Sequence, residues 1–350
     1  MMPELKNAPA SVNVYRIKPS QQRVLRALEK REFFKLIIGG SFTDAKKAHG
    51  LAKVYASAGA HCIDIAPDET VLDAVDQALQ ELPPEIPLPM MMISLPLDAD
   101  PHFRKIDLSQ EQCILCDACI PACPTDAIAT DLTQLLITQP LCYGCGRCVD
   151  ICPTEALSLT PFHQDQEKLE KLLSDPRVDA VELHTRYADP YMLAGFFSRL
   201  GSVLKDKLVF VCFRPSESPV DRWQAFLARL QSFVCETTPF LPLVLQIDGK
   251  PMSGSEDLQA SVPSLIAAQE VYQTTNNVYP LITISGGINA FTAEHLKNPE
   301  YQFISGVGMG TMARKAVWPY IESGDTCDQA FGAARQIVQA FQNRFVCQGL

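Results

Sequence analysis

Short apolar runs alternate with amphipathic stretches through most of this chain, which is the pattern of parallel strands with covering helices. The runs are five to eight residues long, and most of them end in glycine, proline or a polar residue. Eight strands are therefore predicted, at residues 36–40, 61–67, 89–95, 179–184, 208–215, 242–249, 280–287 and 303–310.

Amphipathic stretches follow nearly every run, and one more closes the chain. Two of them begin with a clear start signal, because Asp189 and Ser218 each offer a capping oxygen ahead of a proline. A polar tail and a helix at 21–30 precede the first strand. The other predicted helices cover residues 43–57, 69–82, 166–173, 190–204, 219–234, 263–273, 290–296, 311–321 and 329–345.

Eight strand and helix units fit a (β/α)8 barrel of the TIM type. An open doubly wound α/β sheet is the alternative, because periodicity identifies units but not closure. Residues 1–107 are expected to form the N-terminal part of the barrel with strands 1 to 3, and residues 162–350 the part with strands 4 to 8 and the closing helix. Residues 108–161 interrupt the third unit, so they are expected on the C-terminal face, where active sites of this fold lie.

This insert contains eight of the 13 cysteines. Each half reads C-x2-C-x2-C-x3-C-P, which is the pattern of bacterial [4Fe-4S] ferredoxins. The second half repeats the first at an offset of 29 residues, as from Cys113 to Cys142. The sequence CPTDAI in the first half corresponds to CPTEAL in the second. We therefore predict a duplicated, bacterial-type ferredoxin domain with two [4Fe-4S] clusters.

In two-cluster ferredoxins the fourth cysteine of each half ligates the other cluster. One predicted cluster is held by Cys113, Cys116, Cys119 and Cys152, and the other by Cys142, Cys145, Cys148 and Cys123. Two zinc sites are the alternative, because four cysteines also suit zinc. Zinc sites usually pair two C-x2-C knuckles, so runs of three cysteines with a distant Cys-Pro favour iron-sulfur clusters.

Thirty basic residues stand against 40 acidic ones, and the net charge of -10 argues against nucleic acid or an anionic membrane as a partner. The N-terminal stretch lacks the apolar segment of a signal peptide, and no apolar run reaches the ~18 residues of a membrane span. We therefore expect a cytoplasmic protein in which the cysteines serve metal or redox chemistry rather than disulfides.

Glycines end the last two predicted strands, where barrels build phosphate sites from backbone N-H groups. The two motifs resemble the phosphate grip of FMN-binding barrels such as the dihydroorotate dehydrogenase group, and they imply FMN or another phosphate-bearing ligand. Tight turns and strand glycines are the alternative interpretation. The lysine that such enzymes place at the flavin is not evident, and Arg214 is the nearest cation. The candidate phosphate-binding residues are Gly286, Gly287, Gly308, Gly310 and Thr311.

Six polar residues at strand ends are expected to point into the barrel mouth, although any barrel caps its rim with such side chains. They are Asp64, His184, Arg186, Arg214, Gln246 and Asp248. No nucleophile-base pair is recognisable among them, so no catalytic residue is assigned. Of the remaining cysteines, Cys62 and Cys212 lie inside apolar runs and are interpreted as core, whereas the last three have no ligand spacing. These three are Cys235, Cys327 and Cys347.

Over essentially its whole length the chain resembles the LdpA family, the light-dependent period proteins of cyanobacteria. The eight cysteines of the insert carry the resemblance, together with the stretches DAVELH, ISGGIN and GVGMGTMARK. The resemblance implies a cytoplasmic iron-sulfur protein that reports cellular redox state, and so light, to the circadian clock. It also implies clock components such as KaiA and the input kinase CikA as partners.

Three functions remain open at this stage. In a redox sensor, the state of the clusters would change the binding of protein partners. In a ferredoxin-linked flavin oxidoreductase, a redox donor or acceptor would exchange electrons through the clusters with a flavin in the barrel mouth. A simple electron carrier would not need a barrel of this size. The sensor is the preferred hypothesis, so a sensing or electron-transfer role is favoured over catalysis.

Overall fold

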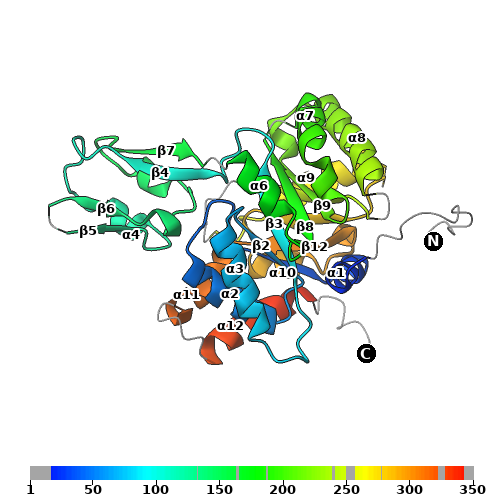
Figure 1. The fold of residues 1–350 in the computed structure, drawn as a ribbon, viewed down its shortest axis with the longest axis horizontal. Coiled ribbons are helices and arrows are strands. Elements are labelled where there is room, and N and C mark those ends of the chain that lie inside the picture. The colour runs from blue at the N-terminus through cyan, green and yellow to red at the C-terminus, as the bar shows by residue number, and fades with distance from the viewer. Residues whose placement is uncertain are drawn as a thin grey trace, which may run out of the picture.

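The computed structural model describes residues 17–131, 133–162, 165–186, 188–238, 241–249, 257–276, 278–321 and 328–342. Eight parallel strands close into a barrel in the order β1-β12-β11-β10-β9-β8-β3-β2 (Figure 1). The predicted (β/α)8 barrel is confirmed, and the open sheet is wrong, because β1 pairs with both β2 and β12. The strands are β1 (Phe33–Ile37), β2 (Cys62–Ile65), β3 (Met90–Pro96), β8 (Ala180–Thr185), β9 (Leu208–Phe213), β10 (Val244–Asp248), β11 (Ile282–Ser285) and β12 (Ile304–Met309).

The first strand begins earlier than predicted. The prediction placed it at 36–40, whereas β1 spans Phe33–Ile37 and the following glycines lie in the loop after it. Lys35 caused the error, because a lysine inside an apolar run reads as a break in the strand. Its side chain is buried inside the barrel, where it forms an ion pair with Glu182 of β8.

Helices surround the barrel at nearly the predicted positions. Asp189 caps α7 as expected, accepting a hydrogen bond of 2.9 Å from the backbone N-H of Tyr191. The expected cap at Ser218 is wrong, because α8 begins one residue later with Pro219 as its cap residue. Residues 343–345 of the predicted closing helix lie outside the described residues. The helices are α1 (Pro19–Glu29), α2 (Ala45–Ser57), α3 (Glu69–Gln80), α6 (Gln166–Leu173), α7 (Pro190–Leu200), α8 (Val220–Thr237), α9 (Val262–Thr274), α10 (Ala290–His295), α11 (Thr311–Ile321) and α12 (Asp328–Gln342), with short 3-10 turns η2 (Gly201–Leu204), η3 (Pro215–Glu217) and η4 (Pro299–Tyr301).

The cysteine segment leaves the barrel after β3 and returns before α6, so it occupies the predicted βα connection. Residues 104–161 form an arm that projects from the barrel (Figure 1). Strand β4 contains residues on both sides of the predicted boundary at 107 and pairs with β7 in an antiparallel ladder, which closes the arm at its base. The elements of the arm are β4 (Arg104–Leu108), α4 (Cys119–Ala122), β5 (Ile128–Thr130), β6 (Leu135–Ile137), η1 (Gln139–Leu141), α5 (Arg147–Asp150) and β7 (Leu157–Pro161).

The barrel is solid at its N-terminal end and hollow at the other. Val24 and Leu28 of α1 pack with Phe33 and Phe210 inside that end, and Cys62 belongs to the same buried cluster, as interpreted from the sequence. Apolar side chains thus fill the lower barrel, as they do in this fold generally. A cavity opens at the C-terminal face, where the arm is attached.

Candidate functional site

The two halves of the arm share their backbone conformation as well as their cysteines. Three pairs of residues separated by 29 positions both adopt positive φ, a conformation that is uncommon outside glycine. Four of these six residues are not glycine, so the repeated conformation follows the position in the repeat and not the residue type alone. The pairs are Leu115 (52°) with Gly144 (69°), Asp117 (57°) with Gly146 (83°), and Asp126 (53°) with Glu155 (55°).

The eight cysteines of the arm line two separate cavities. Each cavity takes three cysteines from one half and the fourth from the other half, which is the grouping that the ferredoxin pattern predicts. We call them the distal and the proximal thiol sets. The distal set is Cys113, Cys116, Cys119 and Cys152, and the proximal set is Cys142, Cys145, Cys148 and Cys123.

The surroundings of these sulfurs suit a positively charged metal centre. Burial and the neighbouring sulfur of Cys145 raise the pKa of Cys148 to about 12, so this thiol needs a cation to become a thiolate at neutral pH. Backbone N-H groups also point at the sulfurs, from Ala127 to Cys123 at 3.2 Å and from Gly144 to Cys142 at 3.4 Å. Such hydrogen bonds stabilise thiolates and tune the clusters they hold.

The proximal set adjoins the barrel. Tyr143, which stands between two cysteines of that set, lines both the sulfur cavity and the cavity of the barrel mouth. Its ring centroid lies 4.4 Å from the guanidinium carbon of Arg314 in α11. Asp126 accepts a hydrogen bond of 3.2 Å from the indole N-H of Trp318, and the backbone N-H of Thr43 donates to Pro140 at 2.9 Å. The arm is therefore packed against the rim and not only tethered to it.

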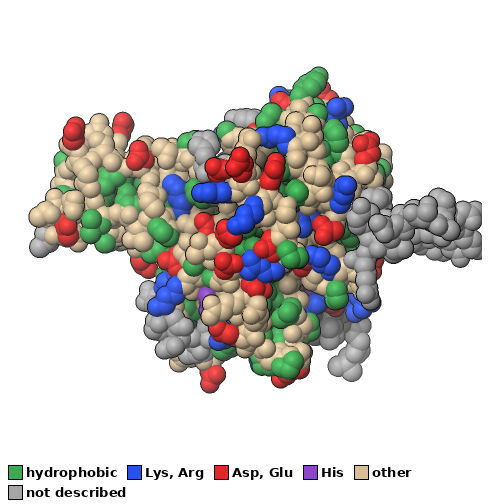
Figure 2. Space-filling view, viewed as in Figure 1, with side chains coloured by type: hydrophobic (Ala, Val, Ile, Leu, Met, Phe, Trp, Pro, Cys, Tyr) green, Lys and Arg blue, Asp and Glu red, His purple; other side chains and the backbone are tan. Residues whose placement is uncertain are grey.

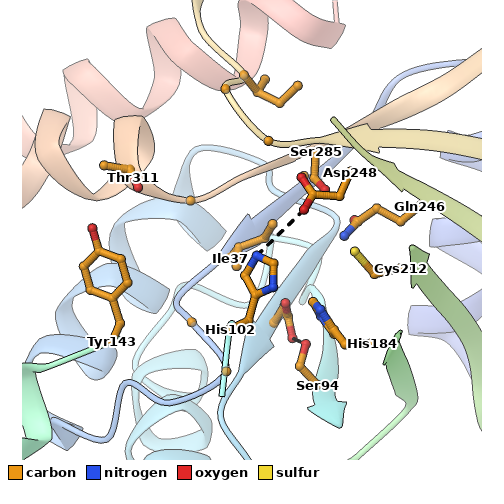
Figure 3. A pocket seen from close by; sticks show the side chains of 18 of the residues that line it. Ile37, Ser94, His102, Tyr143, His184, Cys212, Gln246, Asp248, Ser285 and Thr311 are labelled. Atoms are coloured by element: carbon orange, nitrogen blue, oxygen red, sulfur yellow. Dashed lines mark hydrogen bonds and ion pairs between the residues drawn. The ribbon is translucent and has the colours of Figure 1, made fainter. Parts of the chain in front are cut away.

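The cavity of the barrel mouth has a volume of about 100 Å3. Figure 3 shows Tyr143 and Thr311 on one side of it and His184, Cys212 and Gln246 on the other, with His102 between them. The polar residues on its walls come from six different strands, from α11, from the arm and from the loop that leads into the arm.

All five predicted phosphate-site residues line this cavity. Gly308 lies within β12, and the other four lie just beyond the ends of β11 and β12. Packing already accounts for two of the glycines. A Cβ on Gly287, whose φ is 74°, would collide with the backbone of Ala260, and one on Gly308 would crowd the side chains of Gln246 and Lys35. The phosphate site therefore stays a prediction.

Four of the six predicted rim residues line the cavity, namely Asp64, His184, Gln246 and Asp248. The other two, Arg214 and Arg186, line a smaller neighbouring cavity at the rim, which shares His102, Cys212 and Asp248 with the first. Arg214 donates to Asp248 at 2.8 Å, and Arg186 donates to Glu217 at 2.7 Å.

Below the cavity lies a buried ion-pair network that the sequence analysis missed. Lys35 forms an ion pair with Glu182, and its Nζ is 3.9 Å from Asp64, which accepts a hydrogen bond of 2.6 Å from Ser94. Gln246 donates to the second oxygen of Glu182 at 2.6 Å. The one sequence signal was a lysine and a glutamate inside two apolar runs, FFKLII and AVELH. Lys35 also places a lysine inside the barrel, whereas no lysine for a flavin site was evident from the sequence.

Cys212 is not simply a core residue, because it lines the cavity beside His184. Burial alone would lower the pKa of His184, but Cys212, Asp100 and Asp64 together raise it to about 9. Cys235 is exposed, and Cys327 and Cys347 lie outside the described residues. His102, which also faces the cavity, was missed because it belongs to a loop without regular structure.

Comparisons with known proteins match both the arm and the C-terminal part of the barrel. The family model described as Light dependent period A C-terminal domain matches residues 172–344, and the LdpA Fe-S cluster-binding domain matches residues 119–160. Light dependent period A from Synechococcus elongatus is 28% identical over 326 residues, which cover 90% of each protein. The chain belongs to the LdpA family. A 4Fe-4S binding domain model also matches residues 106–129, so the arm of this LdpA-family protein is an iron-sulfur-binding domain.

Two solved structures share distant similarity with the chain. A Rubisco-like protein from Rhodopseudomonas palustris is 12% identical and has a TM-score of 0.44. The match covers 96% of this chain and 69% of that protein's chain. The carboxyl transferase domain of Rhizobium etli pyruvate carboxylase is 9% identical and has a TM-score of 0.39. The match covers 96% of this chain and 52% of that chain. Among the described residues, no helix has both the length and the apolar character to span a bilayer.

Proposed function

We propose that this protein is an iron-sulfur redox sensor that reports, through the barrel mouth, to protein partners connecting light with the circadian clock. The iron-sulfur family models and the relative named Light dependent period A support this proposal. The partners that the family resemblance implies are KaiA and the kinase CikA. We place the protein in the cytoplasm, where thiols stay reduced and available to metal centres.

The position of Tyr143 is the observation that carries the proposal. This residue lines the proximal thiol cavity and the barrel mouth at once, and its ring packs on Arg314. Arg314 in turn donates to the carbonyl oxygens of Ile37 and Ile38, at 2.8 and 2.9 Å. A continuous packed path therefore leads from the proximal sulfurs to the loop after β1.

Charge provides the physical signal along this path. A bound [4Fe-4S] cluster supplies a one-electron couple, so one unit of negative charge is gained or lost at the proximal set. Arg104 and Arg147 already interact electrostatically with Cys145. Burial weakens solvent screening, so these cations and the Tyr143 loop respond to the added charge. We infer that this response alters the rim surface that partners contact.

The tip of the arm offers a surface for exchange with a redox partner. Ile114 is 62% exposed and Ile151 is 49% exposed, and each is next to a cysteine of the distal set. Figure 2 shows hydrophobic and acidic side chains together on the exposed face of the arm. Exposed apolar residues near a metal centre suit a small, transient protein contact. We infer that the distal set exchanges electrons and the proximal set reports the result.

The experiment compares partner binding by the oxidised and the dithionite-reduced protein, both purified anaerobically with iron and sulfide quantified. KaiA and CikA are the probes. Wild type is expected to change its affinity for at least one of them on reduction, whereas Cys116→Ser and Cys145→Ser lose the redox dependence. Tyr143→Ala is expected to keep both metal centres and lose the dependence, and Tyr143→Phe keeps the ring and serves as its matched control.

Two results would contradict the sensor. Equal partner affinity of the oxidised and reduced wild type, with full iron content, excludes signalling by cluster charge. Redox-dependent binding that survives in Tyr143→Ala excludes the path through the barrel mouth.

A ferredoxin-linked flavin oxidoreductase is the second candidate function. The cavity favours it, because Thr311 and the two glycines that follow β11, Gly286 and Gly287, line the barrel mouth together with Tyr143. A flavin held there would lie beside the proximal set. If so, acid treatment of the anaerobically purified protein should release about one FMN per chain. The variant Gly287→Ala should release none and should lack the yellow colour. A colourless supernatant excludes this candidate and leaves the sensor standing.

A further inference from the structure

Apart from the arm cysteines, metal-ligating side chains also gather at the barrel mouth. A carboxylate oxygen of Asp100 and one ring nitrogen each of His102 and His184 all lie within 4.8 Å of one another. His184 stands in β8, whereas the other two belong to the connection between β3 and β4, at the base of the arm. We propose that these three side chains bind a divalent transition-metal ion.

A buried ring nitrogen points to the ligand. His184 is 7% exposed, and its Nε2 lies 3.0 Å from a carboxylate oxygen of Glu182. Its Nδ1 has no hydrogen-bond partner among the described residues and faces Asp100 Oδ1 at 3.9 Å. That distance is too long for a hydrogen bond, and a buried polar atom without a partner costs free energy. A metal ion held by Nδ1 gives this nitrogen a partner, and it would share Asp100 Oδ1 with His102, whose Nδ1 lies 2.6 Å from that oxygen.

The surroundings hold the proposed ligands in orientation. A ligating histidine commonly donates its second ring N-H to a carboxylate, and Glu182 occupies that place for His184. Glu182 is itself held by Lys35 and by Gln246. Asp100 accepts a hydrogen bond of 2.8 Å from the backbone N-H of His102, which fixes the turn that carries both residues. The three ligands are thus preorganised by buried contacts.

The donor set indicates the class of metal. Two imidazoles and one carboxylate suit zinc or ferrous iron, whereas magnesium and calcium prefer oxygen ligands. Three protein ligands leave positions open toward the cavity, as in catalytic sites. A second group, formed by Glu182, His184 and Cys212, is less suitable because Lys35 and Gln246 already bond both oxygens of Glu182.

Zinc is the probe of choice, because iron in the arm obscures any measurement with ferrous iron. The full-length protein with its arm centres loaded is dialysed anaerobically against zinc, and bound zinc is quantified per chain beside iron. About one zinc ion per chain is expected. X-ray absorption at the zinc edge should then give nitrogen and oxygen ligands at about 2.0 Å, whereas zinc on arm cysteines gives sulfur at about 2.3 Å.

Variants assign the site. His102→Ala and Asp100→Asn are expected to weaken zinc binding by at least about 100-fold, the upper end of what loss of an outer-shell partner costs, with iron content unchanged. The His102 side chain is 21% exposed in a loop, so its removal leaves the barrel core intact. His49→Ala is the matched control, since His49 pairs with Glu81 on the outside of the barrel. Equal zinc affinity in all four proteins, or a spectrum with sulfur ligands only, overturns the proposal.

Discussion

The phenol ring of Tyr143 packs against the guanidinium of Arg314, with the ring centroid 4.4 Å from the guanidinium carbon. One residue lies between Cys142 and Cys145 in the arm, and the other lies in the first turn of α11. A side chain that is 4% exposed thus joins two parts of the chain that are more than 160 residues apart in sequence. The redox centre and the barrel mouth share this contact, and its removal separates them.

Replacement of Tyr143 should loosen the arm without unfolding the barrel. Tyr143→Ala removes a buried aromatic ring, a change that costs about 3 kcal/mol or more in a well-packed site. The loss should act first on the docking of the arm, because Tyr143 reaches the buried cluster of the barrel from the arm and packs on Arg314 at the rim. Hydrogen exchange should become faster in β4, β7 and residues 38–43, while the exchange of β9 and β10 stays unchanged. Tyr143→Phe should match wild type, and uniform acceleration across the barrel strands would contradict the local role.

The crossed assignment of cysteines can be tested with pairs of substitutions. Cys152→Ser should remove the iron held by the distal set, and adding Cys116→Ser should remove no more. Adding Cys145→Ser instead should remove the iron of both sets, because Cys145 lines the other cavity. Iron and sulfide per chain, with electron paramagnetic resonance of the reduced protein, provide the measurement. If Cys152→Ser and Cys145→Ser together lose only as much iron as either alone, each half holds its own cluster and the crossed arrangement is wrong.

The buried pair of Lys35 and Glu182 should be costly to break from one side. Both side chains are fully buried, so Lys35→Met removes the cation at one carboxylate oxygen of Glu182, while Gln246 and His184 remain at the other. Breaking one partner of such a pair typically costs about 3 to 5 kcal/mol, whereas replacing both costs less. The double variant with Glu182→Gln should therefore be more stable than Lys35→Met alone. Urea unfolding of samples with equal iron content measures this, and strictly additive losses would argue against a coupled pair.

The free energy of unfolding should decrease as the pH is lowered, because His61 is held neutral in the folded chain. Burial, assisted by the nearby charge of Arg23, lowers the pKa of His61 to about 3, and its Nδ1 accepts a hydrogen bond of 3.2 Å from the backbone N-H of Phe34. The unfolded chain has the ordinary pKa of about 6.5, so it binds one proton more than the folded chain between these values. The contribution is complete above pH 6.5 and is lost at about 1.4 kcal/mol per pH unit as the pH falls below it.

His61→Asn removes this titration and retains an acceptor. The difference in unfolding free energy between wild type and variant should narrow as the pH falls from 7.5 to 5, a range that limits acid damage to the arm. A constant difference over this range would show that His61 does not titrate on unfolding.

Local signals in the sequence were reliable where one residue's environment depends on its neighbours along the chain. The cap at Asp189 was predicted because a carboxylate, a proline and an amphipathic stretch stand together. The cap at Ser218 failed, although the same signal was present, because the helix there begins after the proline. Lys35 misled the placement of β1, since its partner Glu182 stands 147 residues away and only the closed barrel brings the two together.

The candidate site also combines features that local sequence predicts with features that depend on the fold. The grouping of the cysteines followed from spacing, because a cluster needs several thiolates within one short loop and a duplicated loop supplies the rest. Cys212 was interpreted as core from its apolar run, but alternate residues of a barrel strand face opposite sides, and the height of a residue along the strand decides whether it meets apolar packing or a cavity.

By itself the sequence determined the strand and helix units, the repeated cysteine pattern and the position of the arm after the third strand, because periodicity, caps and ligand spacing are local properties. Only the tertiary structure decided that β1 and β12 close the barrel, that Tyr143 reaches the mouth, and that His102 meets His184. Each of these contacts joins segments far apart in the chain, and their meeting depends on strand pairing around the whole barrel.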